Sequence, residues 1–352
     1  NSTWGDQVHA SVIWPGDADA SFAAHYEPAI DADGNSYVSV GGLPATVIYG
    51  LSLGPSGFPF FGMDTGGYRH AAPPDRELFA RWFQQTALSS VMQVGNNASS
   101  MPWDFATPDG KPLYDEEMLG WYREYARLHL RLFAYEWTLA KRIAIDGRPI
   151  QRPVGLAYPD AGRHPSDEYL FGDDLLVAPV LARGAVERAV YFPAGRWIDW
   201  FDGVVYEGGK DATVPAPLAK LPLFLREGGI VPMLRPTIDT VAPVADPMKV
   251  DSYATTPGVL WARVFPGAAS SFEVFDKTML KQERTAGAIR LEYLPGIEFD
   301  QGAAFEVVGL DRVPQGVTID GQDAAGAVTW IDGTGVILRV EVPAGPHLVE
   351  IS

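Results

Sequence analysis

The sequence has 352 residues, which is too long for one small domain and indicates two or three folding units. Its formal net charge of −17 argues against nucleic acid or another polyanion as a partner, because the chain cannot assemble a basic surface that would offset phosphate repulsion. The sequence has no run of eighteen apolar residues that would span a membrane, and no cysteine, which excludes disulfides, thiolate metal sites and thiol nucleophiles in any compartment.

Three short apolar runs occur in the first third of the chain, and each one ends in turn-forming residues. Their length and composition predict strands that are buried on both faces, as in a parallel sheet. The runs cover residues 10–14, 57–61 and 89–92, and the turns after them contain Asp17, Asp64 and Gln93.

Helical patterns lie between and after these runs. The predicted helices cover residues 43–53, 75–88 and 116–145. Alternating strands and helices are typical of a parallel α/β layer, and three such units make less than half of an eight-fold barrel. In barrels of this kind the chemistry lies where strands end and loops begin, which is the position of the three turn residues named above.

From about residue 149 the pattern changes to strand-like runs separated by Gly, Pro and Asp turns. This pattern predicts an antiparallel β-domain, and after Pro236 a second β-rich stretch continues to the end of the sequence. The predicted strands lie at 174–180, 189–192, 223–225, 272–275, 304–308 and 336–340.

Three motifs carry a resemblance to a known family. They are Trp14-Pro15-Gly16-Asp17, the stretch 58–68 with Asp64 and Gly66-Gly67-Tyr68 at its end, and the stretch 172–180 together with 192–197. In this order and spacing they resemble glycoside hydrolase family 31, the α-glucosidase type, over residues 1 to about 236.

The resemblance implies an α/β part followed by an all-β part. Residues 1–148 would be the C-terminal part of a (β/α)8 barrel, namely its strands six to eight. Residues 149–236 and 237–352 would be a proximal and a distal antiparallel β-sandwich domain. Residues 237–352 match the family only in their position along the chain and not in their motifs.

The resemblance also implies that Asp17 is the general acid/base. Cleavage of a glycosidic bond needs a carboxyl group that stays protonated near neutral pH and a second carboxylate across the sugar ring. The apolar run and Trp14 before Asp17 favour the partly desolvated site that such a carboxyl group requires. From the residues alone, an Asp that only organises the Pro-Gly-Asp turn remains an alternative.

The predicted sugar contacts come from the same three turns. Asp64 lies among glycines that let the backbone pass close to a ligand, and the resemblance implies a sugar-binding carboxylate, with a turn Asp as the alternative. Trp14 and Tyr68 are either sugar platforms or packing residues of the core and rim. Gln93 and Asn96 are expected to hydrogen-bond the terminal sugar.

Two departures from the family pattern bear on activity. The family's nucleophile is an Asp at the end of the fourth barrel strand, and no motif of this sequence matches it. We therefore expect the chain alone to be incomplete as an enzyme, with an N-terminal segment or companion chain that carries the nucleophile as its partner. At the eighth strand, Met92-Gln93-Val94-Gly95-Asn96 replaces Met-Arg-x-His-Gly, which removes two charged contacts to the sugar and leaves space beside Gly95.

No cofactor or metal site is predicted. The six histidines show no ligand spacing. The segment 31–35 has the acidic and glycine residues of a calcium loop but lacks the later Glu ligand, so a hairpin turn is the better interpretation. It would be an insertion in the loop that bears Asp17.

These observations predict an exo-acting retaining α-glycosidase that acts on an oligosaccharide or glycoside by double displacement. The changed eighth strand favours an α-galactoside or α-N-acetylgalactosaminide over a standard α-glucoside. Two alternatives remain, which are an α-transglycosylase that uses the same site and a catalytically silent carbohydrate-binding protein. The second would bind sugars without turnover.

Overall fold

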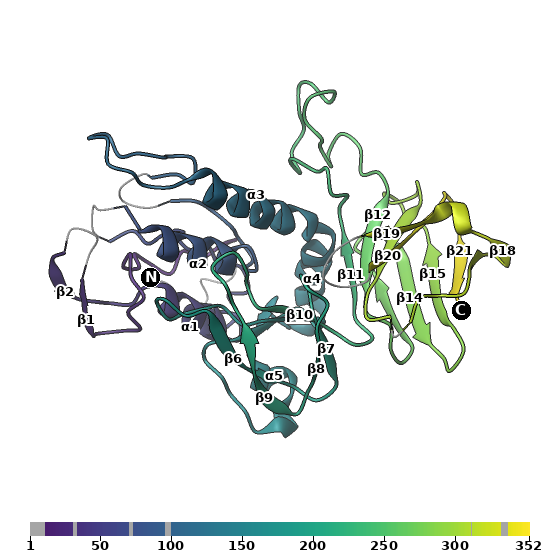
Figure 1. Ribbon diagram of the computed structural model, residues 1–352, viewed down its shortest axis with the longest axis horizontal. Coiled ribbons are helices and arrows are strands. Elements are labelled where there is room, and N and C mark those ends of the chain that lie inside the picture. Colours follow the sequence, from purple (N-terminus) through teal and green to yellow (C-terminus); the bar gives the residue numbers. More distant parts are fainter. Residues whose placement is uncertain (1–10, 31–33, 70–72, 96–99, 311, 332–336) are drawn as a thin grey trace.

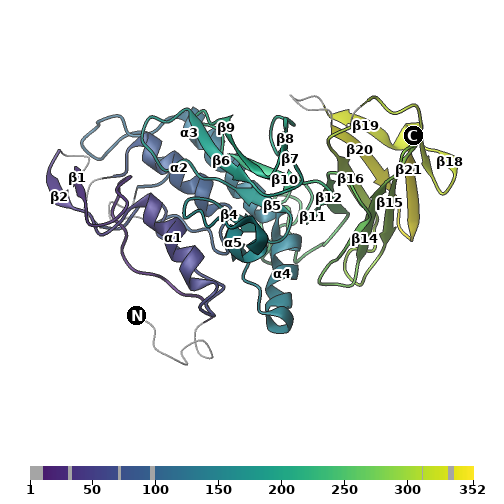
Figure 2. The same ribbon diagram turned by 90° about the horizontal axis from the view of Figure 1, so that it is seen from below.

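The computed structural model describes residues 11–30, 34–69, 73–95, 100–310, 312–331 and 337–352. Figures 1 and 2 show an elongated molecule with the helices of the first half at one end and two large sheets at the other end. A further sheet lies between them. No helix in these ranges has the length and apolar character needed to cross a bilayer.

The three predicted barrel strands lie side by side and parallel, in chain order. Ile13 bridges Phe61 and Gly62 bridges Val91, and the Gly62 N–H donates to the Ile13 carbonyl at 3.0 Å. The parallel arrangement is therefore confirmed, but regular strands are replaced by isolated bridges. Pro59 contributes to this difference because it has no N–H for a strand ladder.

Four longer helices follow or separate these segments. They are α1 (Leu43–Leu53), α2 (Arg76–Thr86), α3 (Glu116–Arg131) and α4 (Phe133–Asp146). Asp75 caps α2 by accepting a hydrogen bond from the Leu78 N–H at 3.0 Å. Gly147 ends α4 in the left-handed conformation with φ of 71°. The first two helices agree with the predicted ranges within two residues.

The prediction of one helix over residues 116–145 is wrong, because the helix is interrupted at Leu132. The Arg131 carbonyl accepts a hydrogen bond from the Leu234 N–H at 2.7 Å. This long-range bond takes the Arg131 carbonyl out of the regular helical pattern. The local pattern of apolar residues could not reveal it.

A buried arginine attaches α2 to the β-rich part of the chain. Arg81 is 1% exposed, and burial lowers its pKa to about 10. Its two terminal nitrogens donate, at 2.7 to 3.1 Å, to the carbonyls of Ala185, Ala216, Pro217 and Lys220. Helix α2 is thereby held in one position behind the second barrel segment.

The sheet next to the helices, here the proximal sheet, has six antiparallel strands. Their order is β3 (Gln151–Arg152), β4 (Tyr169–Phe171), β5 (Leu175–Val177), β10 (Leu223–Arg226), β7 (Arg196–Asp199) and β8 (Val205–Glu207). A two-stranded antiparallel sheet of β6 (Glu187–Phe192) and β9 (Lys210–Pro215) and the short helices α5 (Val154–Ala157) and η2 (Pro159–Ala161) complete this region.

Two further sheets, here the distal sheets, follow. The five-stranded one has the order β11 (Ile230–Met233), β12 (Leu260–Val264), β16 (Ala303–Val307), β20 (Ile337–Val342) and β19 (Val328–Ile331). The six-stranded one has the order β13 (Ser270–Glu273), β14 (Met279–Arg284), β15 (Ile289–Leu294), β21 (His347–Ile351), β17 (Val317–Ile319) and β18 (Gln322–Asp323). A 3-10 turn, η3 (Ala325–Ala327), precedes β19.

Two details of the distal sheets differ from the simple expectation. Strands β12 and β16 pair in parallel, although an antiparallel domain was expected. Strand β11 pairs with β12, so residues 230–233 belong to a distal sheet although they precede the predicted boundary at 236. Both differences depend on pairings between residues far apart in the chain, which period-two patterns do not specify.

One hydrophobic core connects the helices with all the large sheets. It contains Phe83 of α2, Tyr135 of α4, Leu225 of the proximal sheet and, from the two distal sheets, Phe305 and Leu291. A smaller cluster lies beneath the ends of the barrel segments. It consists of Ala18, Leu43, Phe61, Met63, Leu78 and Trp82. This second cluster supports the turns that carry the predicted site residues.

Candidate active site

Asp64 is the centre of the candidate site, and it receives one hydrogen bond from each neighbouring segment. The Trp14 indole Nε1 donates to Asp64 Oδ2 at 2.9 Å, and the Gln93 amide Nε2 donates to Asp64 Oδ1 at 3.0 Å. Trp14 lies at the end of the first segment, and Asp64 and Gln93 follow the second and the third, so three parallel segments bring these side chains together at one edge. The carboxylate is held in a defined orientation as a result.

The two glycines after Asp64 bring its turn against the loop that bears Asp17. Gly66 and Gly67 have φ angles of 102° and 86°, and residues other than glycine rarely adopt such values. A Cβ atom at Gly67 would lie 2.6 Å from the Ala20 nitrogen. A larger residue at position 67 would therefore separate the two loops.

Asp17 is exposed in the loop after the first barrel segment, next to Gly16 with φ of 115°. Among the described residues its carboxylate has no hydrogen-bond or ion-pair partner. Burial raises the pKa of Asp64, the hydrogen bond from Trp14 opposes this shift, and the negative charge of Asp17 raises it further. The two carboxyl groups therefore interact electrostatically.

Both predicted aromatic contacts lie at the surface. The side chain of Trp14 is 51% exposed and that of Tyr68 is 43% exposed, so neither is a core residue. Trp14 also contacts Asp64 through its indole nitrogen. An exposed ring beside a carboxylate is a suitable surface for the apolar face of a sugar.

The turn after the third barrel segment supplies the Gln93 side chain and, at Gly95, an open space beside Asp64. The Gln93 side chain is exposed, and its Oε1 atom accepts no hydrogen bond within the described residues. A Cβ atom at Gly95 would lie in van der Waals contact with Asp64 Oδ1, at 3.4 Å, so a side chain at this position would occupy the space beside that carboxylate. Asn96, the other predicted contact of this turn, lies outside the described residues.

Asp19 was not identified from the sequence as a site residue, although it joins the Asp17 loop to two neighbouring segments. Asp19 is fully buried and accepts hydrogen bonds from the Ser39 hydroxyl at 2.8 Å and from the Val40 N–H at 2.5 Å. Arg69, from the loop after Asp64, forms an ion pair with it at 3.4 Å. In an extended chain residues 17 and 19 would point to the same side, so the local pattern does not predict the burial of Asp19, and its partners come from distant segments.

The segment after the Asp17 loop forms a hairpin, as predicted. Strand β1 (Pro28–Ile30) pairs antiparallel with β2 (Ser36–Val38), and the segment 31–33 of the predicted turn lies outside the described residues. Because Ser39 and Val40 follow β2 directly, Asp19 joins the hairpin to the loop of Asp17. No group of three or more His, Asp or Glu side chains in the described ranges is arranged to hold a metal ion.

Comparison with known proteins agrees with this arrangement. The family model for the TIM-barrel domain of glycosyl hydrolases family 31 matches residues 2–139, and the model for the C-terminal domain of glycosyl hydrolase family 31 matches residues 147–231. An α-xylosidase of Saccharolobus solfataricus is 28% identical over 88% of this chain and 37% of its own length. A sulfoquinovosidase of Agrobacterium fabrum is 31% identical over 63% of this chain and 31% of its own length.

Solved structures show the same fold. A cycloalternan-forming enzyme from Listeria monocytogenes, in complex with a pentasaccharide substrate, superposes with a TM-score of 0.76 at 24% identity, over 97% of this chain and 32% of that one. A family 31 dextranase of Flavobacterium johnsoniae superposes with a TM-score of 0.70 at 20% identity, over 96% of this chain and 44% of that one. This chain spans about a third of the two curated relatives named above. Because the matches to the barrel and to the C-terminal domain follow each other in the family's order, the chain belongs to glycosyl hydrolase family 31.

Proposed function

We propose that this chain carries the acid/base part of a retaining α-glycoside hydrolase, with Asp17 as the general acid/base. The observation that carries the proposal is the Asp64 carboxylate, held by Trp14 and Gln93 beside the exposed carboxyl group of Asp17. Asp64 can accept hydrogen bonds from sugar hydroxyl groups, while Trp14 and Tyr68 offer exposed rings to the sugar face.

The reaction follows the double displacement of retaining enzymes. Asp17 donates its proton to the glycosidic oxygen as that bond breaks, and a carboxylate on the other side of the ring forms the glycosyl-enzyme. Asp17, now ionised, removes a proton from the incoming water, which attacks the sugar carbon and releases the carboxylate. The exposed position of Asp17 is consistent with contact to both the leaving oxygen and the water.

The nucleophile is proposed to come from an N-terminal segment or a companion chain. Within the described residues, the segment around Ile13 has a bridging partner only on the side of Phe61. On its surface Val12 and Trp14 are each 51% exposed, and a depression of about 370 Å³ lies between this segment and α1. A further barrel segment would cover these apolar side chains.

We also propose that the chain divides into the barrel part, residues 1–148, and two β-sandwich domains, residues 149–236 and 237–352. The proximal sheet and the two distal sheets support this division. The strand β11 at 230–233 would then connect the two sandwiches, because it precedes the boundary and pairs within a distal sheet.

The terminal sugar is proposed to be α-galactose or α-N-acetylgalactosamine. Gln93 uses its amide nitrogen on Asp64, which leaves Oε1 available to accept a hydrogen bond from a sugar. Gly95 keeps the space beside Asp64 open for an axial hydroxyl or an acetamido group. An α-transglycosylase is the alternative function. Two relatives, an isomaltosyltransferase and a 1,6-α-glucosyltransferase, support this alternative.

Replacement of Asp17 tests the main proposal. In the protein that includes the nucleophile, Asp17→Ala should lower kcat/KM by about 10²- to 10⁴-fold on substrates with poor leaving groups. The first step on nitrophenyl glycosides should be largely retained, because nitrophenolate leaves without a proton. Equal losses on both substrate types would contradict the acid/base role, and sugar binding with no turnover in the unmodified protein would favour a binding protein.

A further inference from the structure

A second cavity, remote from the Asp17 loop, lies where α4, α5 and the proximal sheet meet. Its volume of about 480 Å³ is within the range of small-molecule sites. Three arginines line it together with an aromatic ring and two carboxylates, namely Arg148, Arg152, Arg226, Tyr158, Asp146 and Asp173. None of these residues is among the predicted acid/base and sugar contacts.

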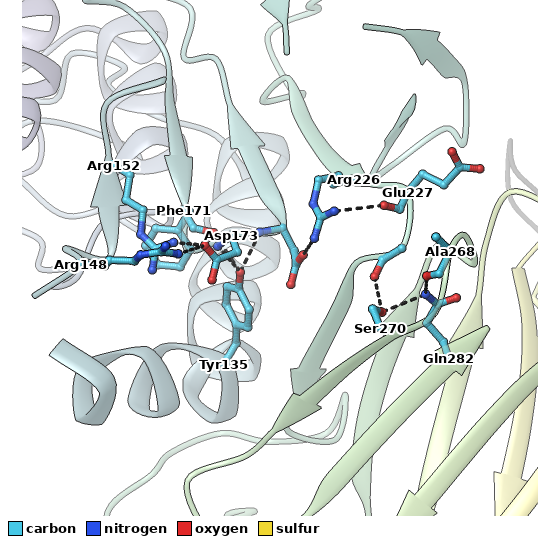
Figure 3. A network of polar contacts seen from close by, with 12 residues as sticks. Tyr135, Arg148, Arg152, Phe171, Asp173, Arg226, Glu227, Ala268, Ser270 and Gln282 are labelled. Atoms are coloured by element: carbon cyan, nitrogen blue, oxygen red, sulfur yellow. Dashed lines mark hydrogen bonds and ion pairs between the residues drawn. The ribbon is translucent and has the colours of Figure 1, made fainter. Parts of the chain in front are cut away.

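The polar wall of this cavity is rigid. Figure 3 shows Arg148 and Arg152 converging on Asp173, and the Arg148 Nη1 atom lies 3.4 Å from Asp173 Oδ1. The buried Tyr135 hydroxyl accepts hydrogen bonds from the backbone N–H groups of Asp173 and Asp174, both at 3.1 Å. The turn that carries Asp173 is therefore fixed to α4 from the inside.

The charges of the wall are already balanced. Asp173 is shared by Arg148 and Arg152, while the buried Asp174 accepts from Arg226 Nη2 at 2.8 Å. Asp146 adds a third carboxylate at the rim. Together with the buried Asp174 behind the lining, three carboxylates balance the three guanidinium groups and leave no excess positive charge for an anion, while the lining residues keep both N–H donors and carboxylate acceptors at the cavity surface.

Part of the cavity lining is apolar. Tyr158 and Leu156 both line the cavity, and the Leu156 side chain is 56% exposed. Paired donors and acceptors together with an aromatic ring in one cavity fit an uncharged polyhydroxylated ligand. Sugar hydroxyl groups both donate and accept, and the C–H face of a pyranose ring covers an aromatic ring.

Helix α1 separates this cavity from the candidate active site. The Leu43 N–H at its start donates to the Ser21 carbonyl, in the loop of Asp17, at 3.0 Å. Gly54, directly after its end, is so close to Pro149 that an added Cβ atom would lie 2.7 Å from the Pro149 Cβ. Eleven helical residues span roughly 16 Å, so the loop of Asp17 and the second cavity lie towards opposite ends of this helix.

We infer that this cavity is a second carbohydrate-binding site, which holds an uncharged oligosaccharide or polysaccharide chain through Tyr158, Arg148 and Asp173. Binding at this place is independent of the role assigned to Asp17. Such a site would retain a chain on the protein after its terminal sugar has left the active site.

Native affinity electrophoresis of the full natural protein tests this inference, with soluble starch, dextran or xyloglucan in the gel. Mobility with polysaccharide is divided by mobility without it, which removes the effect of altered charge. At least one polysaccharide should retard the protein, and Tyr158→Ala should weaken the apparent affinity by about tenfold or more, as expected for loss of an aromatic platform.

The substitution Arg148→Gln should also weaken retardation, and it should leave folding intact because that side chain is 62% exposed. Arg163→Gln is the matched control, since Arg163 is 49% exposed, lies in the same region and does not line the cavity. Absence of retardation by all three polysaccharides would overturn the inference, and so would retardation that survives both Tyr158→Ala and Arg148→Gln. Binding of inorganic sulfate that depends on Arg148, without retardation by polysaccharide, would assign the cavity to anions instead.

Discussion

At the candidate active site, neighbouring segments contact each other through two isolated bridges per pair, whereas in the distal sheets β14 and β15 pair at six successive positions. Trp14 is half exposed, while Phe305 in a distal sheet is completely buried. The position of the site residues depends on a few individual hydrogen bonds and on glycines that permit close approach. The distal sheets depend on many equivalent contacts and on charges that are paired inside them.

This difference predicts different consequences for substitutions in the two regions. A change at the active-site edge should alter binding or catalysis with a small effect on the free energy of unfolding, because few apolar contacts are lost there. A change in the interior of the β-rich part should lower stability and leave the kinetics of the folded protein unaltered. The following substitutions test this comparison.

The largest loss of stability is expected for Glu306→Gln. Glu306 is buried and pairs with Arg263 at 2.7 Å and with Arg131 of α3 at 3.3 Å. Burial opposes its ionisation, but the two arginines outweigh burial and lower the pKa of Glu306. The substitution leaves two buried guanidinium groups without a counter-charge, so the free energy of unfolding in urea should fall by about 3–5 kcal/mol.

The matched control for this prediction is Glu292→Gln on β15. Glu292 pairs with Lys281 at 2.6 Å, but both side chains are more than 40% exposed. Exposed ion pairs contribute about 0–1 kcal/mol, so the control should be nearly as stable as the unmodified protein. Equal effects of the two substitutions would show that burial does not distinguish these pairs.

The next effect concerns the loop of Asp17, where Asp19→Asn should lower kcat by about 10- to 100-fold. The amide can still accept hydrogen bonds from Ser39 and Val40, but it loses the charge that pairs with Arg69. A displaced acid/base impairs proton transfer more than binding, so KM should change little. Measurement of kcat and KM on substrates with good and poor leaving groups would test this expected loss of kcat.

A matched control for Asp19 is Asp109→Asn, whose carboxylate lies in an exposed pair with Lys111. Its kinetics should be those of the unmodified protein. If Asp19→Asn lowered the melting temperature while kcat stayed the same, Asp19 would have a structural role only.

These contrasts also explain which features could be predicted from the sequence. The helices α1 and α2 and the meeting of Trp14, Asp64 and Gln93 follow from local signals, such as the Asp75 cap and turns at strand ends. The role of Asp19, the interruption at Leu132 and the parallel pairing of β12 with β16 could not be predicted. Each depends on partners more than fifteen residues away, and neither periodicity nor propensity specifies such partners.

The pH dependence of stability should report on a buried carboxyl group next to the proximal sheet. Glu168 is 1% exposed, and burial raises its pKa to about 8, against the opposing effects of the Tyr191 N–H and Arg188. The folded protein therefore holds the proton more tightly than the unfolded chain, whose pKa is near 4.5. Stability from this group should fall as pH rises from about 4.5 to 8, by at most about 1.4 kcal/mol per pH unit.

The substitution Glu168→Gln imitates the protonated form and should flatten the pH dependence between pH 5 and 8 in urea unfolding. Glu187→Gln, in an exposed position of β6, serves as the control and should leave the slope unaltered. A slope that is the same in Glu168→Gln and in the unmodified protein would mean that another group titrates in this range.

The smallest expected effect, and the one specific to the active-site edge, is a change of sugar preference in Gln93→Ala. On a panel of nitrophenyl α-glycosides, the protein that includes the nucleophile should prefer the α-galactoside or α-N-acetylgalactosaminide. The substitution should reduce this preference by about tenfold, because a site that hydrogen-bonds a particular substituent discriminates against sugars that lack it. The control Gln322→Ala, at an exposed position of β18, should leave the preference unaltered. Stability should change little in either variant, since the Gln93 side chain is exposed and, among the described residues, hydrogen-bonds to Asp64 alone. A clear preference for the α-glucoside that persists in Gln93→Ala would show that the eighth-strand turn does not select the sugar.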